Sequence, residues 1–266
     1  MAERREDPET LFEVQRMLGE GAAGMVYYAE RIASREPVAI KVVVGTDDAK
    51  KELRILETIS HPNVVSYYGT WEKDSQLWIA LEFCHGGAVS DLMEKLGRGL
   101  GLQELRCITC CSLMGLSYLH GEQLIHRDIK ASNILLSSSG AKLADFGVSA
   151  RLQVPNDRRC TFVGTPYWMS PEVCSRGEYD YKADIWSLGI TVIEMVLSLP
   201  PLAHLHPIEA IEYIRKNDPP VLQSILQTSG ISDIWPQSLH EFVQCCLVKD
   251  FESRPDALQL SQSVSF

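Results

Sequence analysis

The sequence is short of positive charge. It contains 25 Lys and Arg residues against 35 Asp and Glu residues, which gives a formal net charge of −10. Because nucleic-acid binding relies on clustered cations that neutralise phosphates, we expect no nucleic-acid partner. The proportions of hydrophobic (45%) and charged (23%) residues are those of a folded globular chain and exclude extensive disorder.

The sequence also lacks an apolar run suited to crossing a membrane. Its most apolar segment, 185–202, is interrupted by Glu194 and by Pro200-Pro201, which predicts a buried core helix. The first eleven residues are charged and contain no apolar stretch of the signal-peptide type. We therefore expect no membrane insertion and a cytoplasmic location.

Without a secretory signal, cysteines are expected to be reduced thiols rather than a disulfide framework. The eight cysteines are Cys84, Cys107, Cys110, Cys111, Cys160, Cys174, Cys245 and Cys246. Cys107 and Cys110 have the spacing of zinc ligands, but no second pair of Cys or His residues lies at a suitable distance to complete four ligands. We expect buried helical cysteines here.

The first third of the chain has the β-branched runs and turn residues of strands. Strands are predicted at 12–19, 24–32, 37–44, 64–69 and 77–83. Apolar residues at helical spacing predict a helix within 47–60 and a long helix along 102–119. Helical patterns then dominate to the end. A small β-rich lobe followed by a larger helical lobe is therefore expected, with a hinge near 82–87.

Three glycines lie between the first two predicted strands. Gly19, Gly21 and Gly24 form a G-x-G-x-x-G-x-V run that ends at Val26. A glycine-rich turn between strands can be a simple hairpin. Dinucleotide folds place such glycines between a strand and a helix. Strands on both sides favour instead a flap of backbone N–H groups over nucleotide phosphates.

Lys41 ends the apolar strand that follows this glycine run. A lysine in this place either extends its ammonium group into solvent or holds the α- and β-phosphates of a nucleotide. The second role needs a carboxylate that orients the lysine. Glu52, on the predicted helix within 47–60, is the candidate, and the alternative is a solvated glutamate on a charged face.

The segment 126–133 is more specific. It reads His-Arg-Asp-Ile-Lys-Ala-Ser-Asn, and its acid, lysine and asparagine have the order that phosphoryl transfer uses. Asp128 would accept a hydroxyl proton or orient the nucleophile, Lys130 would neutralise the transferring phosphoryl group, and Asn133 would bind magnesium. Asp145, in the following Asp-Phe-Gly sequence, would be the second magnesium ligand.

With these motifs in place, the sequence resembles the eukaryotic protein kinases from about residue 12 to 262. Glu172 stands in Ser-Pro-Glu where the family usually has Ala-Pro-Glu, and Arg254 matches the arginine that pairs with that glutamate. The segment 184–189 matches the motif that opens the central helix of the large lobe. The resemblance implies an α+β, bilobal protein-kinase-like fold. Its expected parts are a charged extension (1–11), an antiparallel β lobe with one helix (12–81), a hinge (82–87) and a mostly helical lobe (88–266).

The resemblance also implies ATP and Mg²⁺ as cofactors and assigns the adenine pocket. Leu81 falls at the gatekeeper position, and Glu82 and Cys84 fall in the hinge whose backbone reads the adenine edge. The apolar side chains expected around the ring are Leu18, Val26, Ala39 and Leu135. Each of these is also what a plain apolar core would supply.

Two loops resemble those of the serine/threonine kinases. Lys130 lies in Asp-Ile-Lys-Ala-Ser-Asn, and Thr165, in Gly-Thr-Pro, is implied to touch Asp128. Thr161 falls where related kinases carry an activating phosphate, which would meet Arg127 and Arg151. The implied partners are protein substrates with Ser or Thr acceptors, and an upstream kinase or a second copy that phosphorylates in trans.

Longer stretches resemble the sterile-20 branch, notably the germinal-centre and Hippo-type kinases, which implies a MAP-kinase or Hippo-type signalling cascade. They include 77–79, 87–91, 142–149 and 246–249. The segment 167–172 also resembles MAP kinase kinase kinases. The small glycine-loop tip, Ala22-Ala23, and the short interval between Lys41 and Glu52 depart from the family pattern. They leave open a pseudokinase that binds nucleotide or partners without turnover.

Overall fold

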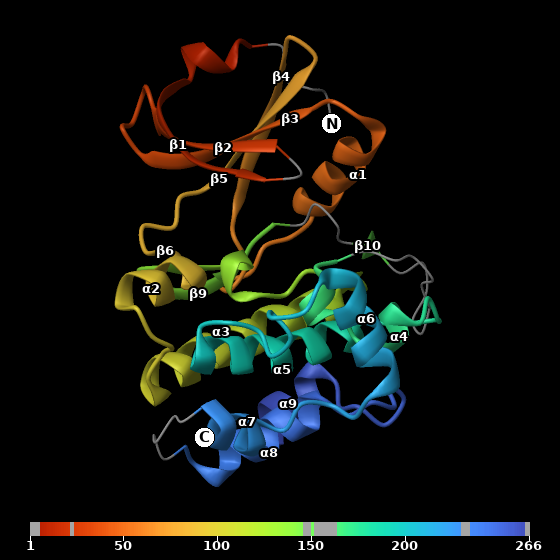
Figure 1. The fold of residues 1–266 in the computed structure, drawn as a ribbon. Coiled ribbons are helices and arrows are strands. Elements are labelled where there is room, and N and C mark those ends of the chain that lie inside the picture. Colours follow the sequence, from red (N-terminus) through yellow and green to blue (C-terminus); the bar gives the residue numbers. More distant parts are fainter. Residues whose placement is uncertain (1–5, 22–23, 146–149, 152–163, 230–234, 264–266) are drawn as a thin grey trace. The chain divides into compact units, whose positions relative to one another are not determined.

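The computed structural model describes residues 6–21, 24–145, 150–151, 164–229 and 235–263. The chain divides into two compact units, Met1–His85 and Gly86–Phe266. The first contains a five-stranded antiparallel sheet and the second is mostly helical (Figure 1). The expected α+β fold class is therefore confirmed.

The first unit is built on one sheet with the strand order β1-β2-β3-β5-β4. Its elements are β1 (Phe12–Gly21), β2 (Gly24–Arg31), β3 (Pro37–Val44), α1 (Asp47–Leu56), β4 (Tyr67–Lys73) and β5 (Gln76–Glu82). Strand β3 is the central strand, and its side chains are buried on both faces of the sheet. Ile40 belongs to a core cluster with Phe12 and Trp71, whose rings meet edge to face at 4.9 Å. Since side chains alternate along a strand, Ala39 and Lys41 lie on the opposite face.

One predicted strand of this unit has the wrong bounds. The strand predicted at 64–69 begins only at Tyr67 and runs to Lys73, because the ladder with β5 starts at the pair Tyr67–Leu81. Val64 and Val65 are buried in the preceding loop, and their burial produced the apolar signal. The helix predicted within 47–60 is confirmed as α1, which ends at Leu56.

Residues just before β1 are also folded. Pro8–Thr10 form a short 3₁₀ helix, η1, which is capped by the side chain of Asp7. Lys73 of β4 forms salt bridges with Asp7 and Glu9 at the protein surface. These exposed pairs contribute little stability on their own, but they attach the charged N-terminal stretch to the sheet.

The second unit is organised around α5 (Lys182–Leu197), which is buried along nearly its whole length. The long helix α3 (Leu102–Gly121) and α8 (Gln237–Cys246) pack against α5, and α9 (Ala257–Ser263) packs against α3 (Figure 1). The buried helix predicted for 185–202 is confirmed up to Leu197. It ends before Pro200 and Pro201, which cannot continue a helix.

The remaining elements of this unit surround those helices. They are β6 (Gly87–Ala88), α2 (Val89–Leu96), β7 (Leu124–Ile125), η2 (Ala131–Asn133), β8 (Ile134–Ser137), β9 (Gly140–Leu143), β10 (Ala150–Arg151), η3 (Pro166–Trp168), α4 (Pro171–Cys174), α6 (Pro207–Lys216) and α7 (Leu222–Ser229). The small sheet β6-β8-β9 joins the segment before α2 to the segment after η2, and the pair β10-β7 joins the segment after α3 to the segment before η3.

The prediction of buried cysteines at positions 107 and 110 is wrong. Both are on α3 as expected, but their side chains are exposed. The buried face of this helix is formed by residues such as Leu105, Ile108 and Ser112, which places Cys107 and Cys110 on the other side. All seven cysteines in the described part of the chain are free thiols. None of the helices in that part is both long and apolar enough to cross a membrane.

One buried ion pair joins distant segments of the helical unit. Arg254 donates from Nη1 and Nη2 to the two carboxylate oxygens of Glu172, at 2.7 and 3.0 Å. Its Nε and Nη1 also donate to the carbonyl oxygens of Val248 and Lys182, and its guanidinium lies 5.2 Å from the centre of the Trp186 ring. The pairing expected from the sequence is therefore present, with both side chains buried and four hydrogen bonds from the guanidinium.

We expect Arg254→Met to lower the free energy of unfolding by about 3–5 kcal/mol, because Glu172 would keep a buried charge without its partner. The double variant Arg254→Met, Glu172→Leu should cost clearly less than the sum of the two single changes. Urea unfolding of the four proteins measures this. Additive losses would contradict the assignment of the pair as one coupled unit.

Candidate active site

The loop that contains Asp128 is held in place by a buried carboxylate of α5. Asp184 is fully buried and accepts hydrogen bonds from the backbone N–H groups of His126 and Arg127, at 2.9 and 2.8 Å. The ring Nε2 of His120, at the end of α3, lies 2.9 Å from the same carboxylate. Burial favours the neutral acid, but the interactions with His120 and His126 outweigh it and hold the pKa of Asp184 below its ordinary value.

Asp128, Lys130, Asn133 and Thr165 form one hydrogen-bonded cluster. The Thr165 hydroxyl donates to Asp128 Oδ1 at 2.6 Å. Lys130 Nζ lies 2.7 Å from Thr165 Oγ1 and 2.8 Å from Asp128 Oδ2. The Asn133 amide nitrogen donates to the backbone oxygen and to Oδ2 of Asp128, both at 2.8 Å. Four of the predicted site residues are thus brought together, including the expected contact of Thr165 with Asp128.

Asp145 is connected to this cluster through the residue before it. The Ala144 N–H donates to the Asn133 carbonyl oxygen at 2.9 Å, and His126 Nε2 lies 3.0 Å from the Ala144 carbonyl oxygen. Arg127 and Asp145 have positive φ angles, 69° and 63°, which non-glycine residues rarely adopt. Such backbone strain persists only where the surrounding structure enforces it, and it concentrates at functional sites.

Gly164 allows the Thr165 loop to approach the Asp128 loop. Its φ angle is 124°, and a Cβ atom built there would lie 2.7 Å from the Arg127 carbonyl oxygen. Any other residue would therefore push the two loops apart and separate Thr165 from Asp128.

Glu194 of α5 joins the same two loops and was not predicted as a site residue. Its Oε2 accepts hydrogen bonds from the Ala131 N–H at 3.0 Å and from the Trp168 indole at 2.9 Å. Burial is the main cause that raises the pKa of this carboxyl group above its ordinary value. In the sequence, Glu194 stood out only as a single charge within an apolar run, and that was the available signal.

In the sheet unit, strand register brings several predicted nucleotide-binding residues onto one face. Val26 pairs with Gly19 on one side and with Lys41 on the other. Ala39 pairs with Leu81 of β5. Because Ala39 and Lys41 are two residues apart on β3, the side chains of all four residues of β2, β3 and β5 project from the same face.

The glycine run forms the hairpin between β1 and β2, with Gly21 paired to Gly24. Gly24 has a φ angle of 138°, and a Cβ atom there would lie 2.3 Å from the Val42 carbonyl oxygen. The conformation and the close approach to β3 both require glycine at this position. Leu18, next to a register shift in β1, is partly exposed.

The predicted hinge residues Glu82 and Cys84 lie in the sheet unit, and Leu135 lies in the helical unit. The Glu82 carboxylate accepts hydrogen bonds from the N–H and hydroxyl of Ser66, at 3.2 and 2.9 Å. Cys84 is buried. In the helical unit, Leu135 of β8 pairs with Ala88 and Lys142.

Some expectations fall beyond the part of the chain that the structure describes. Thr161 and the loop tip Ala22-Ala23 lie outside the described residues. Glu52 lies on α1, but its side chain lies outside the described part, as does that of Arg151 on β10. Arg127 donates from Nη1 to the Tyr179 hydroxyl at 3.2 Å.

The side-chain oxygens of Asn133 and Asp145 are suited to bind a hard divalent cation that also binds phosphate. The amide nitrogen of Asn133 is used by Asp128, so its amide oxygen is the end that remains as a ligand, and Asp145 adds an exposed carboxylate. Mg²⁺ is typically held by one or two protein oxygens together with phosphates and water. Within the described residues there is no cluster of three or more His, Cys, Asp or Glu side chains that would hold a metal by itself.

Glu194 gives a prediction with a matched pair of variants. Glu194→Gln keeps an acceptor for Ala131 and Trp168 and removes the buried charge, whereas Glu194→Ala removes both. At pH 7 we expect the Gln variant to be at least as stable as the wild type and the Ala variant to lose about 1–3 kcal/mol, because two donors lose their acceptor. Chemical unfolding measures both.

The pH dependence of the same comparison has a definite sign. Since the pKa of Glu194 is raised in the folded state, its contribution is fully present below the unfolded value of 4.5 and is lost as pH rises through the folded value. The stability of the wild type relative to Glu194→Gln should therefore fall between pH 4.5 and 7. A rise over that range would contradict the assignment.

Comparison with known proteins agrees with this arrangement. The sequence matches the family described as protein kinase domain over residues 12–266. It is 44% identical, over 261 residues, to the serine/threonine-protein kinase dst1 of Dictyostelium discoideum, and the alignment covers 96% of this chain and 34% of that protein. The chain thus spans about a third of the length of the curated relative that it matches. The family match includes the sheet unit, the Asp128 cluster and the buried pair of Glu172 and Arg254, and the chain belongs to the protein kinase domain family.

Proposed function

We propose that this chain is the catalytic domain of an ATP- and Mg²⁺-dependent serine/threonine protein kinase. The observation that carries the proposal is the cluster in which Asp128 binds Thr165, Lys130 and Asn133 through its side chain. The domain limits proposed from the sequence are 12–266, with 12–81, 82–87 and 88–266 as small lobe, hinge and large lobe. Kinases of this family act in general with ATP and a divalent metal.

The hydrogen-bond count of Asp128 leaves room for a substrate hydroxyl. An ionised carboxylate has about four lone-pair positions. Three side-chain donors occupy Asp128 among the described residues, from Thr165, Lys130 and Asn133. An acceptor Ser or Thr hydroxyl would take a further position, and its proton would pass to Asp128 as the oxygen attacks the γ-phosphorus of ATP. The bond from that phosphorus to the bridging oxygen of the β-phosphate would break at the same time, and ADP would leave.

Lys130 supplies charge at the point of transfer. An ammonium group has three N–H donors, and within the described residues Lys130 uses two of them, on Thr165 and Asp128. The third would bind an oxygen of the transferring phosphoryl group. Asn133 and Asp145 would hold magnesium, which supplies positive charge to the phosphates when bound. Catalysis of this kind consists of positioning and electrostatic stabilisation.

The sheet unit would bind the nucleotide. Lys41 would hold the α- and β-phosphates, with Glu52 as its proposed partner, and the glycine hairpin would cover the phosphates with backbone N–H groups. Val26, Ala39 and Leu81 share a face with Lys41 and would contact the adenine. Leu18 and the backbone of Glu82 and Cys84 would add to these adenine contacts, and the resemblance to protein kinases assigns Leu135 to the adenine as well.

The specificity for Ser and Thr hydroxyls and the kinase branch are inferred from sequence motifs and from the similarity to the dst1 kinase. Lys130 and Thr165, which are linked at 2.7 Å, belong to the two loops that resemble serine/threonine kinases. The 44% identity to a protein named as a serine/threonine kinase supports the same specificity. We propose the sterile-20 branch, a role in a signalling cascade and a cytoplasmic location. Activation would proceed through phosphorylation of Thr161, by an upstream kinase or by a second copy.

Asp128→Asn tests the proposed reaction directly. It should lower phosphate transfer from ATP to a generic basic protein by about 10²–10⁴-fold, because the variant lacks the base. Nucleotide affinity should stay close to that of the wild type. The exposed Glu104→Gln, on α3, serves as a control and should retain full activity. Equal background transfer by wild type and Asp128→Asn would contradict the proposal and favour a protein that binds nucleotide without turnover.

Thr165 offers a second test with two closely matched variants. Thr165→Ser keeps the hydroxyl that bonds Lys130 and Asp128, whereas Thr165→Val keeps the shape and removes it. We expect kcat to fall about 10–100-fold for Val and only a few-fold for Ser, since hydrogen bonds to charged groups contribute about 1.5–3 kcal/mol. Steady-state kinetics with a peptide substrate measures both. Equal kcat values for Val and Ser would show that the hydroxyl does not position the catalytic groups.

A further inference from the structure

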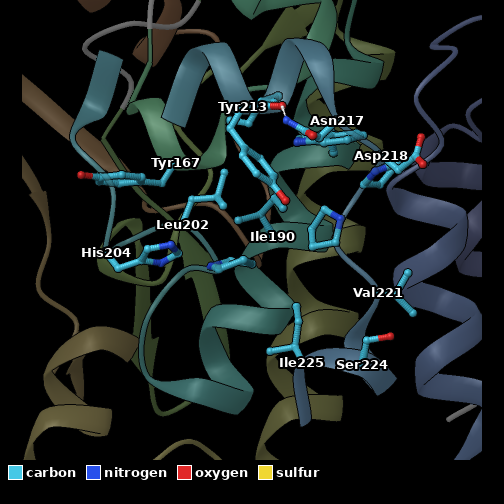
Figure 2. A pocket seen from close by; sticks show the side chains of 15 residues that line it. Tyr167, Ile190, Leu202, His204, Tyr213, Asn217, Asp218, Val221, Ser224 and Ile225 are labelled. Atoms are coloured by element: carbon cyan, nitrogen blue, oxygen red, sulfur yellow. Dashed lines mark hydrogen bonds between the residues drawn. The ribbon is translucent and has the colours of Figure 1, made fainter. Parts of the chain in front are cut away.

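The helical unit contains a cavity that the proposed reaction does not use. It has a volume of about 530 Å³ and lies between η3, α5, α6 and α7 (Figure 2). Ile190 of α5 is buried at its wall, and Leu202, Tyr213 and Ile225 reach it from three other segments. Cavities of about 300–1,000 Å³ with mainly apolar walls are typical of binding sites.

Hydrogen bonds hold the walls of this cavity in place. Tyr167 of η3 donates its hydroxyl to the Leu205 carbonyl oxygen at 2.9 Å. Asn217, just after α6, donates to the Tyr213 carbonyl oxygen at 3.0 Å and accepts at its own backbone oxygen from Lys249 at 2.8 Å. Pro201, Pro219 and Pro220 also line the cavity and restrict its backbone. A preformed site loses less free energy to ordering when a partner binds.

Exposed apolar side chains lie in the wall of the cavity and in a depression next to it. Tyr213 is 46% exposed, Val221 is 43% exposed and Ile208 is 67% exposed. Tyr213 separates the cavity from a shallow depression on α6 that Ile208 and Leu205 also line. In Figure 2 the ring of Tyr213 points from α6 towards Leu202 and Ile190. Apolar surface that is concentrated in this way marks a binding surface.

The position of Tyr167 connects this surface to the reaction. Tyr167 lines the cavity and lies two residues after Thr165, whose hydroxyl donates to Asp128. Two residues span at most about 7 Å of extended chain. A polypeptide with its acceptor hydroxyl at Asp128 would therefore reach the cavity within a few residues of the acceptor.

We propose that this cavity, with Tyr167, Leu202, Tyr213, Val221 and Ile225 as its contacts, binds an apolar or aromatic side chain of the protein substrate. That side chain lies a few residues from the phosphorylated Ser or Thr. The inference rests on the proposed kinase function and adds a specificity-determining site to it. A substrate is the occupant that the geometry favours, because the loop of Thr165 forms part of the cavity wall.

A set of synthetic peptides tests the proposal. Each carries one central Thr in a background of Ala, Gly and Lys, and one Phe at a single position within about eight residues on either side. We expect Phe at one position, or at two neighbouring positions, to raise kcat/KM about tenfold to a hundredfold over the unsubstituted peptide. Fluorescence anisotropy of the same peptides, with Ala in place of Thr, measures binding without phosphate transfer.

Two variants should remove the preference. Val221→Glu and Tyr213→Ala change partly exposed side chains, so the core of the unit is unaffected. In both, the ratio of kcat/KM between the best Phe peptide and the unsubstituted peptide should fall towards one. The control Leu258→Glu changes a somewhat more exposed apolar residue on α9 and should keep the preference and the full activity.

The outcomes separate this inference from the proposed function. If no peptide is phosphorylated by the wild type, the proposed function fails, and anisotropy still decides whether the Phe peptide binds at Val221. No effect of Phe at any position, or an effect that persists in both cavity variants, overturns the inference. Self-association that Val221→Glu abolishes, without any peptide preference, would also overturn it and make a second copy the occupant.

Discussion

The candidate active site depends on one buried carboxylate. Asp184 has no contact with solvent, and a buried charge is costly unless hydrogen bonds satisfy it. Two of its partners are the backbone N–H groups of His126 and Arg127, so the loop must turn at this point to satisfy the charge. The positive φ angle of Arg127 is enforced by the same bonds. Asp128 follows immediately, and its direction is therefore set by the interior of the helical unit.

The helix that carries Asp184 also fixes the neighbouring loop. Ser187 donates to the Trp168 carbonyl oxygen, Thr191 donates to the Ile129 carbonyl oxygen, and Glu194 accepts from Ala131 and Trp168. At three- and four-residue spacing these side chains form one polar stripe on an otherwise apolar buried helix. One rigid element thus positions both loops that meet in the Asp128 cluster. Such positioning matters because small displacements of reacting groups cost large factors in rate.

Much of the fold and of the site was predictable from local patterns. The G-x-G-x-x-G-x-V run forms the expected hairpin, and the segment 126–133 supplies three members of the cluster in the expected order. The predictions were wrong where a residue's burial does not follow from its secondary structure. Val64 and Val65 are buried without being in a strand, and Cys107 is helical without being buried. A single sequence shows that a residue is apolar or lies on a helix, but the facing element decides whether it is covered.

The sequence by itself determined which chemical groups are available and in which local order. Asp128, Lys130 and Asn133 lie within six residues, so the turn between them brings them together. Only the tertiary structure decided that Glu194 joins the loops of Ala131 and Trp168, and that a cavity opens beside Tyr167. The bond between Glu194 and Ala131 spans 63 positions of the chain. A contact of that range exists only because packed helices bring the two segments together, and no local pattern encodes it.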